Sequence, residues 1–176
     1  MKPTTIPILR TGTALALTAL WLTACGTWQS TKETSADVAR AIFVAKVKQM
    51  NLAIDGRAEL NLDERGVSLP VALRVYQLKD AKAYATATYA QLLNDTSPVL
   101  EADELNRTDL TLGPNGTVTL SVPMDDDAQY VGVAAFFRAP TNAEWQLVIP
   151  KSRWKETNPV KISAIGNTLE LEGRSR

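Results

Sequence analysis

Alternation of apolar and polar residues marks several short stretches of the chain. The clearest is residues 69–78, LPVALRVYQL, in which Val71, Leu73 and Val75 point to one side of an extended backbone. A period of two is typical of a β-strand with one buried face. Residues 50–60 and 117–122 alternate in the same way and predict two further strands.

Two stretches break this alternation. Residues 80–93, DAKAYATATYAQLL, place Ala83, Ala87 and Ala90 on one face of a helix that Asp80 can cap. Residues 130–138, YVGVAAFFR, are nearly all apolar, which predicts a central strand buried on both faces.

Turn residues separate the remaining strands. Gly113-Pro114-Asn115-Gly116 lies between residues 105–112 and 117–122 and predicts a hairpin of these two strands. Gly166-Asn167 predicts a second hairpin near the end of the chain. Seven or eight short strands with one inserted helix around residues 80–93 predict a mainly β protein, an antiparallel β-sandwich.

The only cysteine, Cys25, directly follows Leu22-Thr23-Ala24. A basic start and the short apolar run of residues 14–22 precede it, and this run is too short to span a bilayer. These features define a secretory signal, and Leu-Thr-Ala-Cys resembles a bacterial lipobox. We therefore expect removal of residues 1–24 and a covalent diacylglyceryl and N-acyl lipid on Cys25. The alternatives are a plain signal peptide with an incidental cysteine, and a buried core cysteine.

The expected mature chain, which begins at Cys25, has two parts. Residues 25–37 are polar and predict a tether, and residues 38–176 predict a single β-sandwich domain. Residues 36–48 fit either a short helix, which we favour, or the beginning of a strand. Gly26 stands where an Asp tends to retain such lipoproteins in the inner membrane, so we expect the outer membrane, with the domain facing the periplasm.

Composition narrows the function classes. The whole chain balances 19 basic against 19 acidic residues, and removal of Lys2 and Arg10 leaves a net charge of −2. This charge argues against nucleic-acid binding, which requires a basic face. The chain has no histidine, and a lipidated Cys25 leaves no free thiol. We therefore expect no enzyme, no metal, no cofactor besides the lipid, and no small-molecule substrate.

Two acidic loops are candidate sites. The first lies between the first two predicted strands, and it is either a docking site or a solvated turn. If its apolar members are exposed they are its stronger candidates, because binding hot spots are usually well packed. The second, Asp125-Asp126-Asp127, is either a calcium site or a solvated turn, and we favour the turn because no EF-hand spacing follows. The residues of the first loop are Asn61, Leu62, Asp63, Glu64, Arg65, Gly66, Val67, Ser68 and Leu69.

Several blocks of the sequence, the most specific being residues 74–78, RVYQL, and residues 130–138, resemble one family. The other positions are Leu60-Asn61-Leu62-Asp63, Arg65-Gly66, Pro70-Val71, Tyr84, Tyr89, Leu92, Leu110, Pro114, Gly116, Trp145 and Ile149-Pro150. Together with the lipobox, these blocks resemble the TssJ family, the outer-membrane lipoproteins of the bacterial type VI secretion system.

The resemblance implies a transthyretin-like β-sandwich with an added helix, and a structural role. It also implies a partner, the periplasmic C-terminal part of the inner-membrane protein TssM, through which TssL is reached indirectly. Members of the family use the loop between the first two strands for this contact, which corresponds to residues 61–69. A periplasmic lipoprotein that binds a small ligand inside the sandwich is the alternative hypothesis, and an enzyme is a third.

Overall fold

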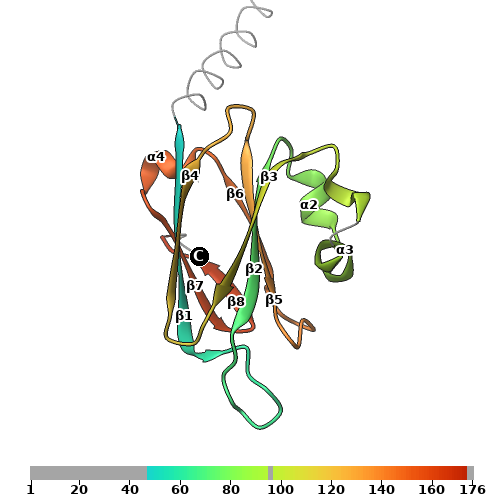
Figure 1. The fold of residues 1–176 in the computed structure, drawn as a ribbon, viewed down its shortest axis with the longest axis vertical. Coiled ribbons are helices and arrows are strands. Elements are labelled where there is room, and N and C mark those ends of the chain that lie inside the picture. The colour runs from blue at the N-terminus through green and yellow to red at the C-terminus, as the bar shows by residue number, and fades with distance from the viewer. Residues whose placement is uncertain (1–46, 95–96, 174–176) are drawn as a thin grey trace, which may run out of the picture. The chain divides into compact units, whose positions relative to one another are not determined.

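The computed structural model describes residues 47–94 and 97–173. The predicted signal segment, Cys25, the tether and most of residues 36–48 lie outside the described residues. The described chain forms two four-stranded sheets (Figure 1). The first sheet has the order β4 (Thr117–Pro123), β1 (Gln49–Leu60), β7 (Val160–Gly166), β8 (Thr168–Leu171). The second has the order β3 (Glu104–Leu112), β2 (Val71–Leu78), β5 (Tyr130–Phe136), β6 (Gln146–Pro150).

The alternating pattern produces the core between the two sheets. Val71, Leu73 and Val75 are each 1% exposed and pack with Leu52 and Ile54 of the opposite sheet in one apolar cluster. The predicted mainly β sandwich is therefore confirmed. One pair of strands differs from the prediction, because β1 and β7 run parallel while the other pairs are antiparallel.

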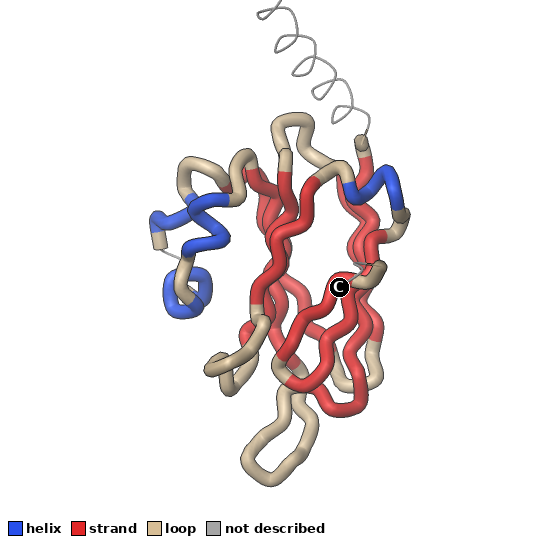
Figure 2. The backbone as a smooth tube through the Cα atoms, turned by 180° about the vertical axis from the view of Figure 1, so that it is seen from behind, coloured by secondary structure: helices blue, strands red, loops and turns tan. Residues whose placement is uncertain are grey.

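A helical layer covers the outer face of the second sheet (Figure 2). It consists of α2 (Lys82–Thr86), α3 (Tyr89–Leu93) and the 3-10 turn η1 (Pro98–Leu100). Tyr76 and Tyr84 pack in a second apolar cluster beneath this layer. A side chain on Gly132 would meet the Tyr84 ring at 2.8 Å, so this glycine allows the layer to lie close to the sheet. Strand β5 is consequently buried on both faces, as predicted.

The inserted helix is divided in two, contrary to the single helix predicted around residues 80–93. Ala87 is extended, with φ −64° and ψ 137°, and ends α2. Thr88 begins α3 through a capping box with Gln91, whose side chain accepts from the Thr88 N–H. The alanines keep their helical spacing across this break, so the spacing predicts one continuous helix. It does not reveal that Thr88 favours the start of a new one. Asp80 instead accepts from the N–H of Lys82, at 2.6 Å.

The predicted hairpin of residues 105–112 and 117–122 is wrong. Strand β3 pairs with β2 in the second sheet, whereas β4 pairs with β1 in the first. The turn at residues 113–116 therefore crosses from one sheet to the other. An alternating strand can bury its apolar face against the opposite sheet as well as beside its neighbour, and the pattern does not distinguish these arrangements. The predicted hairpin through Gly166-Asn167 is confirmed as the β7–β8 pair.

The registers of the strand pairs show that the connecting loops lie at two opposite ends of the sandwich. Residues 61–70, 113–116, 137–145 and 166–167 share one end, which we call the loop end. Val47, the β4–β5 loop of residues 124–129, and the helix α4 (Arg153–Glu156) share the other, which we call the tether end. The described part of the chain holds no helix that is long and apolar enough to cross a membrane.

Candidate partner-binding site

The loop of residues 61–70, here the β1–β2 loop, projects from the loop end of the sandwich (Figures 1 and 2). Its tip is a tight hairpin. The Asp63 N–H donates to the Val67 carbonyl at 2.9 Å, and the Gly66 N–H donates to the Asp63 carbonyl at 3.0 Å. Gly66 has φ +77°, which favours glycine in a three-residue hairpin loop. The sequence Asp-Glu-Arg-Gly thus specifies the turn.

The Asp63 carboxylate serves this turn. Its Oδ1 accepts from the N–H groups of Val67 at 2.8 Å and Arg65 at 2.9 Å, and its Oδ2 lies 3.4 Å from the Arg65 guanidinium. The hydrogen bond from Val67, with those from Arg65, holds the pKa of Asp63 below its usual value. The side chain is only 13% exposed, so its charge is directed into the loop more than outward.

Asn61 fastens the base of the loop. This residue is 3% exposed, has φ +49°, and donates through Nδ2 to the Pro70 carbonyl at 2.8 Å. Its Oδ1 accepts from the N–H of Arg138, and its own N–H donates to the Gly166 carbonyl at 2.8 Å. Asparagine tolerates the left-handed region, so it can close the loop and bind three neighbouring segments at once.

The apolar residues of the loop differ in exposure. Leu62 is 40% exposed and Val67 is 51% exposed, whereas Leu69 is half-buried. Glu64 and Arg65 are exposed at the tip, and Ser68 is half-buried, with its hydroxyl donating to the Ala58 carbonyl. The loop therefore presents two apolar side chains and two charged ones on a backbone that is already ordered.

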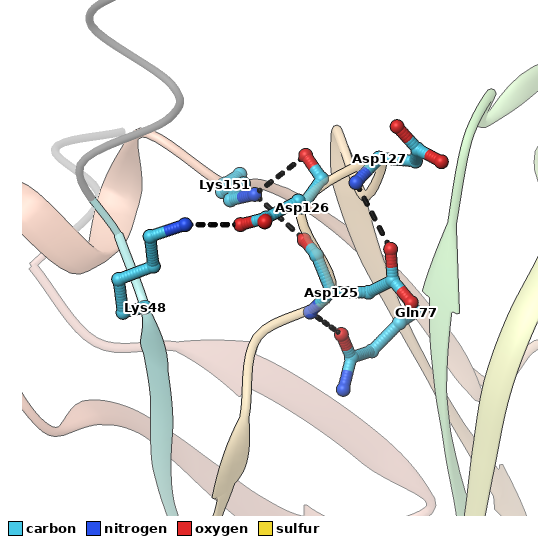
Figure 3. Close-up of polar contacts among 6 residues, drawn as sticks. All are labelled: Lys48, Gln77, Asp125, Asp126, Asp127 and Lys151. Atoms are coloured by element: carbon cyan, nitrogen blue, oxygen red, sulfur yellow. Dashed lines mark hydrogen bonds and ion pairs between the residues drawn. The ribbon is translucent and has the colours of Figure 1, made fainter.

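The other acidic loop has a different construction (Figure 3). Gln77 accepts from the Asp125 N–H at 2.7 Å and donates to the Pro123 carbonyl at 3.0 Å. The Lys151 ammonium, in a residue only 1% exposed, donates to the carbonyls of Asp125 at 2.7 Å and Asp126 at 3.2 Å. Burial lowers the pKa of Lys151 from its usual value. Lys48 pairs with the Asp126 carboxylate and holds the pKa of that group below its usual value.

This arrangement bears on the calcium alternative. A lysine ammonium lies against the loop carbonyls that a cation would need, and the Asp125 Oδ1 accepts from the Asp127 N–H at 2.9 Å. Within residues 47–94 and 97–173, no three histidine, cysteine or carboxylate side chains come together as a metal site would require. The β4–β5 loop is thus a hydrogen-bonded turn.

One feature of the loop end could not be located from the sequence. Ile165, on β7, is 38% exposed and lies one residue before Gly166, whose carbonyl binds Asn61. The Gly166-Asn167 turn was recognisable, but the parallel register that places it beside the base of the β1–β2 loop was not.

The described domain is thus a β-sandwich with one projecting loop on which Leu62 and Val67 are exposed. The family model described as type VI secretion lipoprotein (VasD, EvfM, TssJ) matches residues 48–167. The chain belongs to this family of type VI secretion lipoproteins.

Solved structures agree with this assignment. A chain in a structure described as a type VI membrane complex is 34% identical, with a TM-score of 0.67, over 72% of this chain and 98% of that one. A chain in a structure described as the T6SS protein TssM C-terminal domain from EAEC is 32% identical, with a TM-score of 0.65, over 73% of this chain and 100% of that one.

The crystal structure of the T6SS lipoprotein TssJ1 from Pseudomonas aeruginosa shares the fold. Its TM-score is 0.63 at 19% identity, over 73% of this chain and 98% of that one. No curated protein sequence matches the chain.

Proposed function

We propose that the protein is a lipid-anchored structural component of the type VI secretion membrane complex. In this proposal it ties the complex to the outer membrane by binding the periplasmic domain of TssM, and reaches TssL only through TssM. Residues 1–24 are removed, residues 25–37 form the lipidated tether, and residues 38–176 form the binding domain. The domain faces the periplasm, and its role is mechanical, with no catalytic step.

The observation that carries the proposal is the separation of the two ends of the sandwich. The chain leading from Cys25 joins the domain at the tether end, at Val47, and β1 carries the backbone to the β1–β2 loop at the opposite end. A 12-residue strand spans about 40 Å. A lipid at one end and a docking loop at the other is the arrangement that a tether needs.

The choice of TssM rests on the solved structures and on the loop. Two chains more than 30% identical occur in structures described as a type VI membrane complex and as the TssM C-terminal domain. The β1–β2 loop offers Leu62 and Val67 as exposed apolar contacts, and Glu64 and Arg65 as charges that can orient the encounter. Asn61, Asp63, Gly66, Ser68 and Leu69 shape the loop.

The anchor adds membrane affinity independently of the partner. One acyl chain binds a membrane reversibly, whereas two or more signals hold a protein firmly, and each buried methylene contributes about 0.8 kcal/mol. Fully extended, the chain between Cys25 and Val47 reaches at most about 75 Å. The domain can therefore meet a partner well away from the membrane surface.

One observation bears on the alternative function, a carrier of a small ligand. A hollow of about 490 Å³ lies against Tyr76, Leu100 and Arg107 on the outer side of the second sheet, and its volume is within the range of ligand pockets. It lies outside the sandwich, however, and apolar side chains fill the space between the two sheets. We therefore favour the tether.

Substitution of Cys25 by Ser tests the anchor. We expect Cys25→Ser to move the protein from the outer-membrane fraction to the soluble periplasmic fraction and to abolish secretion, while the purified domain keeps its thermal transition. The measurement is fractionation of the envelope followed by immunodetection. If Cys25→Ser protein stays with the outer membrane and still supports secretion, the anchor at Cys25 is wrong.

A further inference from the structure

The β1–β2 loop is small for a complete binding site. Stable protein interfaces engage about 20–30 residues on each side, and the loop supplies residues 61–69. Neighbouring segments at the loop end must therefore contribute to any stable contact that the loop makes. The candidates are residues 113–116, residues 137–145 and the end of β7 with its turn.

Hydrogen bonds join the loop to two of these segments. Asn61 binds the Gly166 carbonyl at 2.8 Å and the Arg138 N–H at 2.9 Å. Asn167 donates through Nδ2 to the Ala139 carbonyl at 3.0 Å, which connects the β7–β8 turn with the segment after β5. Hydrogen bonds therefore join the base of the loop, the β7–β8 turn and residues 138–139.

Exposed apolar side chains concentrate at this end. Among the described residues, the large apolar side chains that stand out from the surface are Leu62, Val67, Ile165 and Leu93. The first three belong to the loop end. Leu93, 51% exposed, lies on α3 in the helical layer. Single exposed apolar residues are ordinary, but three of these four lie at the loop end: Leu62 and Val67 on the projecting loop, and Ile165 next to Gly166, which binds the loop base.

The side chain of Ile165 points away from the core. Ile162 and Ala164 of β7 are buried in the core, so Ile165 points to the outer face of the first sheet. There it is 38% exposed, opposite Thr168 of β8. A strand residue at this site could be polar without loss to the core.

We propose that Ile165 is a second apolar contact for the partner that binds the β1–β2 loop. This inference rests on the proposed function and extends it: the partner surface is an apolar cleft that receives Leu62 and Val67 together with Ile165. The Asp63 carboxylate, which is occupied within the turn, shapes the loop and does not contact the partner. Binding energy in this interface comes mainly from buried apolar side chains, and Glu64 and Arg65 act on the rate of encounter.

The test compares Ile165→Thr with Leu93→Thr. Threonine retains the strand preference of isoleucine, and Leu93, at 51% against 38% for Ile165, provides a more exposed apolar residue away from the loop end. The soluble domain from Gly26 onward is titrated against the purified TssM periplasmic domain, and thermal unfolding confirms that each variant is folded. We expect Ile165→Thr to raise Kd about tenfold or more, and Leu93→Thr to change it less than about twofold.

A variant in which residues 62–68 are replaced by a Gly-Ser-Gly link tests docking through the loop separately from the second contact at Ile165. If this variant loses binding while Ile165→Thr binds with unchanged Kd, the second contact is wrong and docking through the loop stands. If Leu93→Thr weakens binding as much as Ile165→Thr, the contact is not confined to the loop end and the inference fails. Unchanged binding of the loop-replaced variant would overturn the proposed interface itself.

Discussion

The β1–β2 and β4–β5 loops are both acidic, but they are held in the structure in different ways. Each contains adjacent acidic residues, and in each an aspartate accepts backbone N–H groups within its own turn. The β4–β5 loop is held from outside by Lys48, Gln77 and Lys151, two of which are buried. The β1–β2 loop is held near its base, by Asn61 and Ser68, and it projects with Leu62 and Val67 exposed.

The difference shows that adjacent acidic residues occur in loops of quite different construction. In the β4–β5 loop, the side chains of Gln77 and Lys151 form hydrogen bonds with the backbone of Asp125 and Asp126. These bonds fix the loop to the rest of the domain. At the tip of the β1–β2 loop the Asp63 carboxylate accepts the backbone N–H groups of Arg65 and Val67, and the side chains of Leu62 and Val67 are exposed. We expect substitutions in the first loop to affect binding, and substitutions around the second to affect stability.

The largest effect on stability is expected for Lys151→Met. Methionine fills the same space but leaves the carbonyls of Asp125 and Asp126 without their ammonium donor, partly offset by relief from burying a charge. The free energy of unfolding should fall by about 1–3 kcal/mol. Chemical denaturation measures this change, and TssM binding by the folded variant should be unaltered.

Lys48→Met is the matched control. Lys48 pairs with Asp126, but both side chains are largely exposed, at 68% and 73%. Such surface pairs contribute about 0–1 kcal/mol, so this variant should unfold close to the wild-type midpoint. Equal stability of Lys151→Met and the wild type would show that the buried lysine does not hold the loop.

A smaller effect is expected from acid at Asp63. Its pKa is lowered, so its hydrogen bonds from Val67 and Arg65 are fully present above the ordinary aspartate pKa near 4 and are lost as the pH falls through the lowered value. The NMR amide resonance of Val67 should stay constant from pH 7 to 5 and move only below about pH 4. In Asp63→Asn this movement should vanish. A shift between pH 5 and 7 would contradict the assigned role.

Much of the fold follows from local sequence patterns. The alternation in residues 69–78 correctly predicted the buried face of β2. The continuous apolar run of residues 130–138 correctly predicted that β5 is a central strand buried on both faces. The partners of β3 and β4 could not be obtained in this way, because an alternating strand has the same pattern in either sheet. The break at Ala87 depended on Thr88 and Gln91, whose capping box competes with the helical period of the alanines.

The candidate site, too, could be predicted from the sequence only in part. The hairpin tip could be anticipated from Asp63 and Gly66, since both residues have turn preferences of their own. The burial of Asn61 depends on segments about 75 and 105 residues further along the chain, Arg138 and Gly166, and no local pattern reports such contacts. That this loop contacts a partner is a prediction from the family resemblance, while the structure shows which of its side chains are exposed.

The most direct measurement of the central claim is the affinity of two loop variants for the TssM periplasmic domain. In one, a Gly-Ser-Gly link replaces residues 62–68; in the other, Asp126→Asn and Asp127→Asn alter the β4–β5 loop. We predict that the first raises Kd at least about a hundredfold and that the second changes it less than about twofold. A folded first variant that binds with wild-type Kd would contradict docking through the β1–β2 loop.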